Sequence, residues 1–241
     1  MDLSIIIPAF REGTKVRHDV EAAAAFLVKH DLKGEIIVVD DGSPDDTAAA
    51  ANAAEVPPGV ERRVIRYTPN RGKGFAVRNG MNASQGQFVM FADVGLCVPF
   101  EDAQKGLAMI RAGECEIAHG SRKLPDSLIL RRQRLHRRFM SWLFRKIVGL
   151  FMGVPGALTD TQCGFKVYRG DVARELYGGC LSDGFMFDIE ILLRALKKGY
   201  RVREFPVEWR CDWDSRLRPG RSAVDTFSEL SAVKRNLRDS T

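Results

Sequence analysis

The sequence has few of the features that mark secreted, zinc-binding or membrane-spanning proteins. Five cysteines are spread over 241 residues without a CxxC pair, so neither a disulfide framework nor a zinc site is indicated, and a reducing compartment is expected. Pro8 interrupts the apolar run at residues 3–7 before that run reaches the length of a signal peptide. The longest apolar stretch, residues 147–158, contains glycine and proline and falls short of the roughly 20 residues of a membrane-spanning helix. A cytoplasmic protein is therefore expected.

Two kinds of ligand-binding motif are also missing. No GxGxxG follows the first expected strand, which argues against a dinucleotide-binding oxidoreductase. The turn Arg71-Gly72-Lys73-Gly74 precedes an expected helix, where backbone N–H groups bind phosphate well, but the turn lacks the spacing of a P-loop. Lys and Arg number 37 against 31 Asp and Glu, and this excess favours an anionic partner. Because no nucleic-acid module is present, a lipid headgroup or a phosphate ligand is expected rather than nucleic acid.

The chain alternates short β-branched runs with longer helical patterns. This alternation predicts an α/β fold with βαβ units and a mainly parallel sheet flanked by helices on both faces. The expected strands are residues 3–8, 35–39, 62–67, 87–92, 116–119 and 201–209. The expected helices are residues 16–29, 45–54 and 101–112, one that ends near residue 83, and one that begins near residue 223. From residue 160 to the last strand, the pattern is that of a loop followed by a helix.

The composition shifts at a basic amphipathic segment, residues 131–152. On a helical projection its leucine and aromatic side chains lie on one side and its arginines on the other. We expect one domain, residues 1–223, that includes this segment, followed by a C-terminal helix at residues 224–241. The residues alone leave two interpretations of the segment: a surface helix that packs its apolar stripe on the core, or an interfacial helix that contacts a membrane.

Carboxylates follow three of the expected strands. Glu12 follows the first strand, Asp40 and Asp41 end the second, and Asp93 ends the fourth. Because ligands of open parallel sheets bind beyond the carboxyl ends of the strands, these side chains are candidates for a ligand or metal site. The alternative is that they cap the helices that follow, as Asp and Ser often do.

Seven short runs occur in order along the chain. They are Ile6-Ile7-Pro8-Ala9-Phe10-Arg11-Glu12, Val38-Val39-Asp40-Asp41-Gly42-Ser43, Asn70-Arg71-Gly72-Lys73-Gly74, Phe91-Ala92-Asp93, Gly120-Ser121-Arg122, Asp160-Thr161-Gln162-Cys163-Gly164-Phe165-Lys166 and Phe187-Asp188-Ile189-Glu190. This set resembles family 2 glycosyltransferases, which have the GT-A fold, with a Rossmann-like sheet. Within that family the chain is most similar to the polyprenyl (dolichyl) phosphate hexose synthases, the branch of the dolichyl-phosphate glucosyl- and mannosyltransferases.

The resemblance implies roles for the residues that match. Those implied to bind the nucleotide sugar are Pro8, Phe10, Glu12, Asp40, Asp41, Lys73 and Asp93. Asp93 corresponds to the first aspartate of the family's DxD metal motif, whereas Gly95 stands at the second position. A divalent cation, Mg²⁺ or Mn²⁺, is then expected on Asp93, water and the diphosphate oxygens, since magnesium sites often use only one or two carboxylates. Because the second carboxylate is missing, the alternative remains that the protein binds the nucleotide sugar without catalysing transfer.

The implied reaction is inverting transfer of a hexose from UDP-glucose or GDP-mannose to a polyprenyl phosphate. A phosphate monoester is already ionised at neutral pH, so catalysis reduces largely to positioning and charge stabilisation. Arginine suits such an acceptor because its planar fork binds phosphate at two points. The implied acceptor-phosphate ligands are Arg122, Arg134, Arg137 and Arg216, and the implied catalytic residues are Asp93, Asp160 and Gln162. Asp188 and Glu190 are secondary candidates that would also suit a helix N-terminus.

A lipid acceptor is met at the bilayer surface. The resemblance therefore favours the interfacial interpretation of residues 131–152 and predicts peripheral association with a membrane. Transfer to a hydroxyl of a glycan or glycolipid remains an alternative, and it would require a general base.

Overall fold

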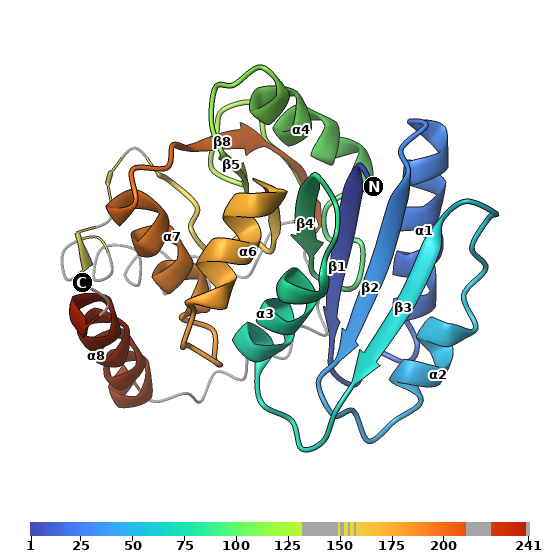
Figure 1. The fold of residues 1–241 in the computed structure, drawn as a ribbon, viewed down its shortest axis with the longest axis horizontal. Helices are drawn as coiled ribbons and strands as arrows, with labels where there is room; N and C mark the ends of the chain where they lie inside the picture. The colour runs from blue at the N-terminus through green and yellow to red at the C-terminus, as the bar shows by residue number, and fades with distance from the viewer. Residues whose placement is uncertain (132–148, 150–151, 154, 157, 211–222, 240–241) are drawn as a thin grey trace.

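A seven-stranded sheet runs through the centre of the computed structural model, with helices on both faces (Figure 1). The structure describes residues 1–131, 149, 152–153, 155–156, 158–210 and 223–239. In spatial order the strands are β3 (Glu61–Arg66), β2 (Gly34–Asp40), β1 (Leu3–Ala9), β4 (Phe88–Ala92), β7 (Phe165–Arg169), β5 (Ile117–Ser121) and β8 (Val202–Pro206). The helices are α1 (Val16–Lys29), α2 (Thr47–Asn52), α3 (Lys73–Ala83), η1 (Phe100–Asp102), α4 (Ala103–Arg111), α6 (Gly170–Gly178), α7 (Phe187–Lys197) and α8 (Ala223–Asp239). The expected α/β fold is confirmed.

The first strands end together at one rim of the sheet. β1 is parallel to both β2 and β4, and its register sets Ala9 opposite Asp40 and Ile6 opposite Phe91. Every residue of β2 is buried, as expected for a β-branched strand that is covered on both faces. The residues that follow these strands are therefore brought close to one another.

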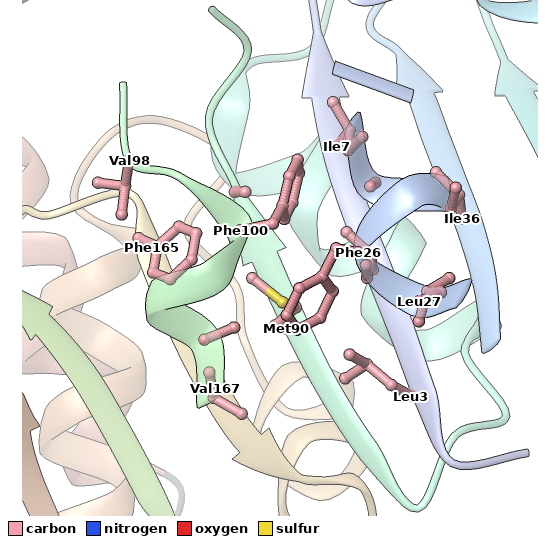
Figure 2. Close-up of a cluster of buried hydrophobic side chains, with 14 of the residues drawn as sticks. Leu3, Ile7, Phe26, Leu27, Ile36, Met90, Val98, Phe100, Phe165 and Val167 are labelled. Atoms are coloured by element: carbon pink, nitrogen blue, oxygen red, sulfur yellow. The ribbon is translucent and has the colours of Figure 1, made fainter. Parts of the chain in front are cut away.

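Two apolar layers attach the helices to the sheet. On one face, α1 packs Phe26 and Leu27 against the sheet, and Phe100 joins the same cluster (Figure 2). On the other face lie α3, α6 and α7, with buried side chains that include Val77 and Phe187. Each large side chain buried in this way contributes roughly 1.5–3 kcal/mol, so the two layers hold the strand ends in fixed positions.

The strand β7 differs from the sequence-based prediction, which had a loop and a helix in this region. It is antiparallel to both neighbours, β4 and β5, and it pairs Phe165 with Ala92. Lys166 is the second residue of β7, whose first four residues are buried, and a lysine there conceals the apolar run from which a buried strand is recognised. The strand brings the segment at residues 160–166 next to Asp93.

The expected strand at residues 201–209 divides in two. β8 pairs with β5, and β9 (Glu208–Arg210) pairs with β6 (Leu128–Arg131) in a separate two-stranded sheet. At the C-terminal end, α8 buries Leu230 and Val233 against Met186. Most of the predicted amphipathic segment, residues 131–152, lies outside the described residues, and the domain division stays a prediction. In the described part of the chain, no helix is both long and apolar enough to cross a membrane.

Two glycines let the start of α3 approach the loop before α7. A Cβ added to Gly72 would lie 2.5 Å from the Asp183 carbonyl oxygen, and one added to Gly74 would lie 2.5 Å from the Ser182 carbonyl oxygen. Gly72 also has a φ of 109°, which side chains rarely tolerate. The residue between them is Lys73, so the backbone contact fixes the origin of that side chain.

We expect Gly74→Ala to lower the free energy of unfolding by roughly 1–3 kcal/mol, because the added methyl overlaps backbone that cannot move independently. Gly178→Ala is the matched control, since a Cβ at this position of α6 meets nothing within 4 Å. That control is expected to be neutral or slightly stabilising. Urea denaturation of both variants checks the expectation, and equal stabilities would contradict it.

Candidate functional site

The turn after β2 is organised by its two aspartates. Asp41 accepts hydrogen bonds from the backbone N–H groups of Arg71 and Gly72 at 2.8 and 2.9 Å, and from Asn70 Nδ2 at 2.6 Å. Asp40 Oδ1 accepts the N–H of Ser43 at 2.9 Å. Both side chains are buried. Asp40 thus shows the turn-capping role that the sequence left open, and Asp41 shapes the loop that leads to Lys73.

The loop after β1 is joined to the same turn. The N–H of Arg11 donates to Ser43 Oγ at 2.8 Å, and the N–H of Glu12 donates to Thr47 Oγ1 at 2.8 Å. Pro8, Phe10 and Glu12 are half-buried at this rim. The structure therefore brings together the predicted nucleotide-binding residues from β1, β2 and the start of α3.

Lys73 and Asp93 form an ion pair in which Nζ and Oδ1 are 2.6 Å apart. The side chains are 21% and 38% exposed, so the pair can be reached from solvent. Burial alone would lower the pKa of Lys73, but the carboxylates of Asp93 and Asp188 raise it above its ordinary value. The ammonium group therefore keeps its charge at neutral pH.

A second ion pair lies deeper, between Lys166 of β7 and Asp188 at the start of α7. Lys166 Nζ also donates to the Thr161 carbonyl at 3.0 Å. Burial raises the pKa of Asp188, while the charges of Lys166 and Lys73 oppose the rise. Lys166 belongs to one of the seven runs that carry the family resemblance, but no role was predicted for it. A lysine in a buried strand is itself a signal of a functional or ion-paired position.

The third pair joins Arg122 to Asp160. Arg122 Nε and Nη2 donate to the two carboxylate oxygens at 2.6 and 2.7 Å, and its backbone N–H donates at 3.0 Å. Burial would raise the pKa of Asp160, but the bonds and charge of Arg122 hold it below its ordinary value. Glu204 of β8 holds the backbone at this position, since it accepts the backbone N–H of Asp160 at 2.7 Å. The sequence analysis missed Glu204.

These three pairs form one charged cluster. Its members are Lys73, Asp93, Arg122, Asp160, Lys166 and Asp188. The Cys163 thiol lies among them, and burial raises its pKa to about 12, while the nearby charges of the cluster act in opposite directions. The thiol is therefore protonated and unreactive at neutral pH.

Other predicted residues have different outcomes. The side-chain nitrogen of Gln162 is buried and has no hydrogen-bond acceptor among the described residues, so it retains a donor for a ligand. Arg134, Arg137 and Arg216 lie outside the described residues. Glu190 is buried and accepts the N–H groups of Leu181 and Ser182, which makes it a support for the loop before α7.

The described residues do not fit a divalent cation held by protein side chains. Gly95 supplies no carboxylate, and the carboxylate of Asp93 already faces the ammonium group of Lys73. Among residues 1–131, 158–210 and 223–239 no cluster of three or more His, Cys, Asp or Glu side chains is placed to bind a metal. A cation at Asp93 would have to take most of its ligands from the diphosphate and water.

One buried carboxylate outside the motifs contacts this rim. Asp19 of α1 is 2% exposed, and its Oδ1 accepts the N–H groups of Gly95 and Leu96 at 2.9 and 3.0 Å. Burial raises the pKa of Asp19 from 3.8 to about 7, with a smaller contribution from the charge of Glu12. No local sequence pattern indicates this contact, because Asp19 and its two partners are more than 70 residues apart.

Known proteins with similar sequences belong to one enzyme family. The profile described as Glycosyl transferase family 2 matches residues 4–177. The chain is 31% identical to dolichyl-phosphate beta-glucosyltransferase of Dictyostelium discoideum, over 96% of this chain and 73% of that protein. It is 32% identical to the protein of the same name from Mus musculus, over 96% of this chain and 74% of that protein.

Solved structures share the fold. Glucosyl-3-phosphoglycerate synthase of Mycobacterium tuberculosis, crystallised with Mn²⁺ and UDP-glucose, superposes with a TM-score of 0.67 at 19% identity, over 97% of this chain and 75% of that chain. The same synthase has also been crystallised with Mg²⁺ and UDP. These likenesses confirm the expected GT-A fold.

The raised pKa of Asp19 predicts how stability depends on pH. Between about pH 4 and pH 7 the folded protein holds this proton more tightly than the unfolded chain, so the free energy of unfolding falls as pH rises. Asp19→Asn removes this dependence, and we expect it to gain roughly 1–3 kcal/mol relative to the wild type between about pH 5 and pH 8. Urea denaturation of the wild type and Asp19→Asn at about pH 5 and pH 8 measures the two free energies of unfolding. If the difference between the two proteins were the same at both pH values, the raised pKa of Asp19 would be refuted.

Proposed function

The chain belongs to glycosyl transferase family 2, and from this premise we propose that it moves glucose from UDP-glucose to the phosphate of a polyprenyl lipid. GDP-mannose is the alternative donor. The observation that carries the proposal is the charged cluster, in which Lys73 beside Asp93 and Arg122 beside Asp160 gather at the end of the sheet where the first strands stop. Relatives that are 31% and 32% identical and bear the name dolichyl-phosphate beta-glucosyltransferase support the choice of acceptor.

The nucleotide is assigned to the loops after β1 and β2. Pro8, Phe10 and Glu12 come from the first loop, and Asp40 and Asp41 organise the second. Lys73 follows directly on the turn that Asp41 holds, and its ammonium group supplies positive charge for the diphosphate. Asp93 keeps that ammonium group in place, which makes the pair the centre of donor binding.

The transfer needs one bond to form and one to break. An oxygen of the acceptor phosphate attacks the anomeric carbon of glucose, and the bond from that carbon to the diphosphate breaks, so the electron pair leaves with UDP. Inversion follows from attack on the face opposite the leaving group. Because the acceptor is already an anion, positioning and stabilisation of the leaving charge are the tasks of the protein.

Arg122 is assigned to the acceptor phosphate. Its Nε and Nη2 atoms are bound to Asp160, so Nη1 is the part of the guanidinium group outside that fork. Gln162 lies two residues beyond Asp160 and carries a buried amide donor, which suits a sugar or phosphate oxygen. Arg134, Arg137 and Arg216 remain predicted contributors to the same phosphate site.

Contact with a lipid surface is also part of the proposal. Leu128 and Leu130 of β6 are 60% and 52% exposed, and they precede the arginine-rich start of the segment at residues 131–152. Exposed apolar side chains beside basic residues suit a surface that carries anionic lipids. Peripheral membrane association would bring the protein to its acceptor.

The proposal predicts a lipid-extractable radiolabelled product when the protein is given labelled UDP-glucose and a detergent-solubilised polyprenyl phosphate. Polyprenol, which lacks the phosphate, is the matched acceptor and is expected to give no product, since its hydroxyl would need a general base. Labelling of polyprenol or of a glycan would favour transfer to hydroxyls. Binding of UDP-glucose without transfer to any acceptor would favour the non-catalytic alternative that Gly95 suggests.

Lys73→Met is expected to weaken UDP binding about tenfold or more, because it removes the cation that meets the diphosphate. Lys198→Met is the control, since Lys198 pairs with Glu175 on the surface. Calorimetric titration of both variants with UDP measures the effect. Equal affinities in the two variants would exclude Lys73 from the diphosphate site.

The same titration addresses the cation. Because the described residues supply one carboxylate and Lys73 faces it, we expect UDP affinity in EDTA to stay within about threefold of that in Mg²⁺ or Mn²⁺. A loss of tenfold or more on chelation, abolished by Asp93→Ala, would instead mean that Asp93 and the diphosphate recruit the cation.

A further inference from the structure

The loop between β4 and η1 carries Asp93 and has an unusual backbone. Gly95 has a φ of 101° and Leu96 a φ of 48°, so two consecutive residues lie in the left-handed region. Leucine is disfavoured there because its Cβ crowds the following carbonyl group. A loop of this shape persists only when contacts from outside hold it.

Three contacts hold this loop, and they come from different parts of the chain. The N–H of Asp93 donates to the Gly164 carbonyl at 2.9 Å, and the Cys97 carbonyl accepts the N–H of Arg210 at 2.9 Å. Between these two backbone contacts, the N–H groups of Gly95 and Leu96 both donate to Asp19 Oδ1. Asp19 is thus the side chain that holds the left-handed turn.

The burial of Asp19 calls for an explanation. Its second oxygen, Oδ2, is buried and has no hydrogen-bond donor among the described residues. A buried carboxylate with half of its acceptor capacity unused is unfavourable for folding alone. Its position beneath the loop that carries Asp93 gives this unfavourable burial a functional reason.

We infer that Asp19 is a positioning residue for the donor site, which it serves by fixing the turn at Gly95 and Leu96 and through it the Asp93–Lys73 pair. This inference rests on the proposed function. In a chain with glycine at the second position of the DxD motif, no side chain at residue 95 can be anchored by a ligand. The hydrogen bonds from α1 supply that anchorage from beneath.

The test compares Asp19→Ala with Asp19→Asn, with UDP as the probe in calorimetric titration. Asp19→Ala removes both bonds to the loop, and we expect it to weaken UDP binding about tenfold. Asp19→Asn keeps a carbonyl oxygen that accepts both N–H groups, so its UDP affinity is expected within threefold of the wild type. In turnover, Asp19→Ala is expected to raise the KM for the donor about tenfold and to change the KM for the acceptor less than twofold.

Glu35→Ala is the matched control. Glu35 is also a buried carboxylate that accepts a backbone N–H, from Gln85 at 2.8 Å, but it lies at the amino end of β2, away from the rim. We expect this variant to lose stability and to keep its affinity for UDP. Equal losses of affinity in Asp19→Ala and Glu35→Ala would show that Asp19 acts through general stability, and would overturn the inference.

Amide hydrogen exchange of the wild type gives a second test that does not require the alanine variant to fold. Slow exchange at Gly95 and Leu96 is expected, and rapid exchange at both would overturn the inference because the bonds would not hold the loop. The same titrations distinguish a failure of the proposed function from a failure of the role of Asp19. If the wild type binds neither UDP nor GDP, both the proposed function and the role of Asp19 are wrong. If the wild type and Asp19→Ala bind UDP with equal affinity, only the role of Asp19 is wrong.

Discussion

The antiparallel pairing of β7 with β4 is the contact on which the site depends. The N–H of Asp93 donates to the Gly164 carbonyl just beyond the paired residues, and a Cβ on Gly164 would lie 2.0 Å from the Asp93 carboxylate. This closeness joins the DxD position to a segment from the second half of the chain. Lys166 lies on β7, and Asp160 and Gln162 lie in the segment that leads into it.

The charged side chains of the cluster can lie close together because each positive group is paired with a negative one. Each cation of the cluster has a carboxylate at hydrogen-bond distance, and Asp160 also accepts the backbone N–H of Arg122. Buried ion pairs contribute little net stability because desolvation offsets their attraction. The centre of the Phe91 ring lies 6.0 Å from Lys73 Nζ and 5.4 Å from Lys166 Nζ, so the two lysine pairs define the geometry of the site more than they add stability.

Much of the fold could be predicted from the sequence, because β1, β2 and β4 are continuous apolar runs and α1 has regular helical spacing. The convergence of Asp41, Lys73 and Asp93 followed from parallel strands that end at one rim. β7 escaped prediction because its second residue, Lys166, interrupts the apolar run. Asp19 and Glu204 escaped because their partners are backbone N–H groups distant in sequence, which no local pattern reveals.

The ion pairing of the cluster has a consequence for product release. Three cations and three carboxylates make the cluster electrically balanced before any ligand arrives. If the diphosphate binds Lys73 as proposed, it competes with Asp93 for the same ammonium group, and binding becomes an exchange of partners. In that assignment the carboxylate takes back the ammonium group when the spent nucleotide departs, and the re-formed pair offsets part of the free energy lost on release. A site of this kind would limit its own affinity, which suits a transferase that releases a charged product in every cycle.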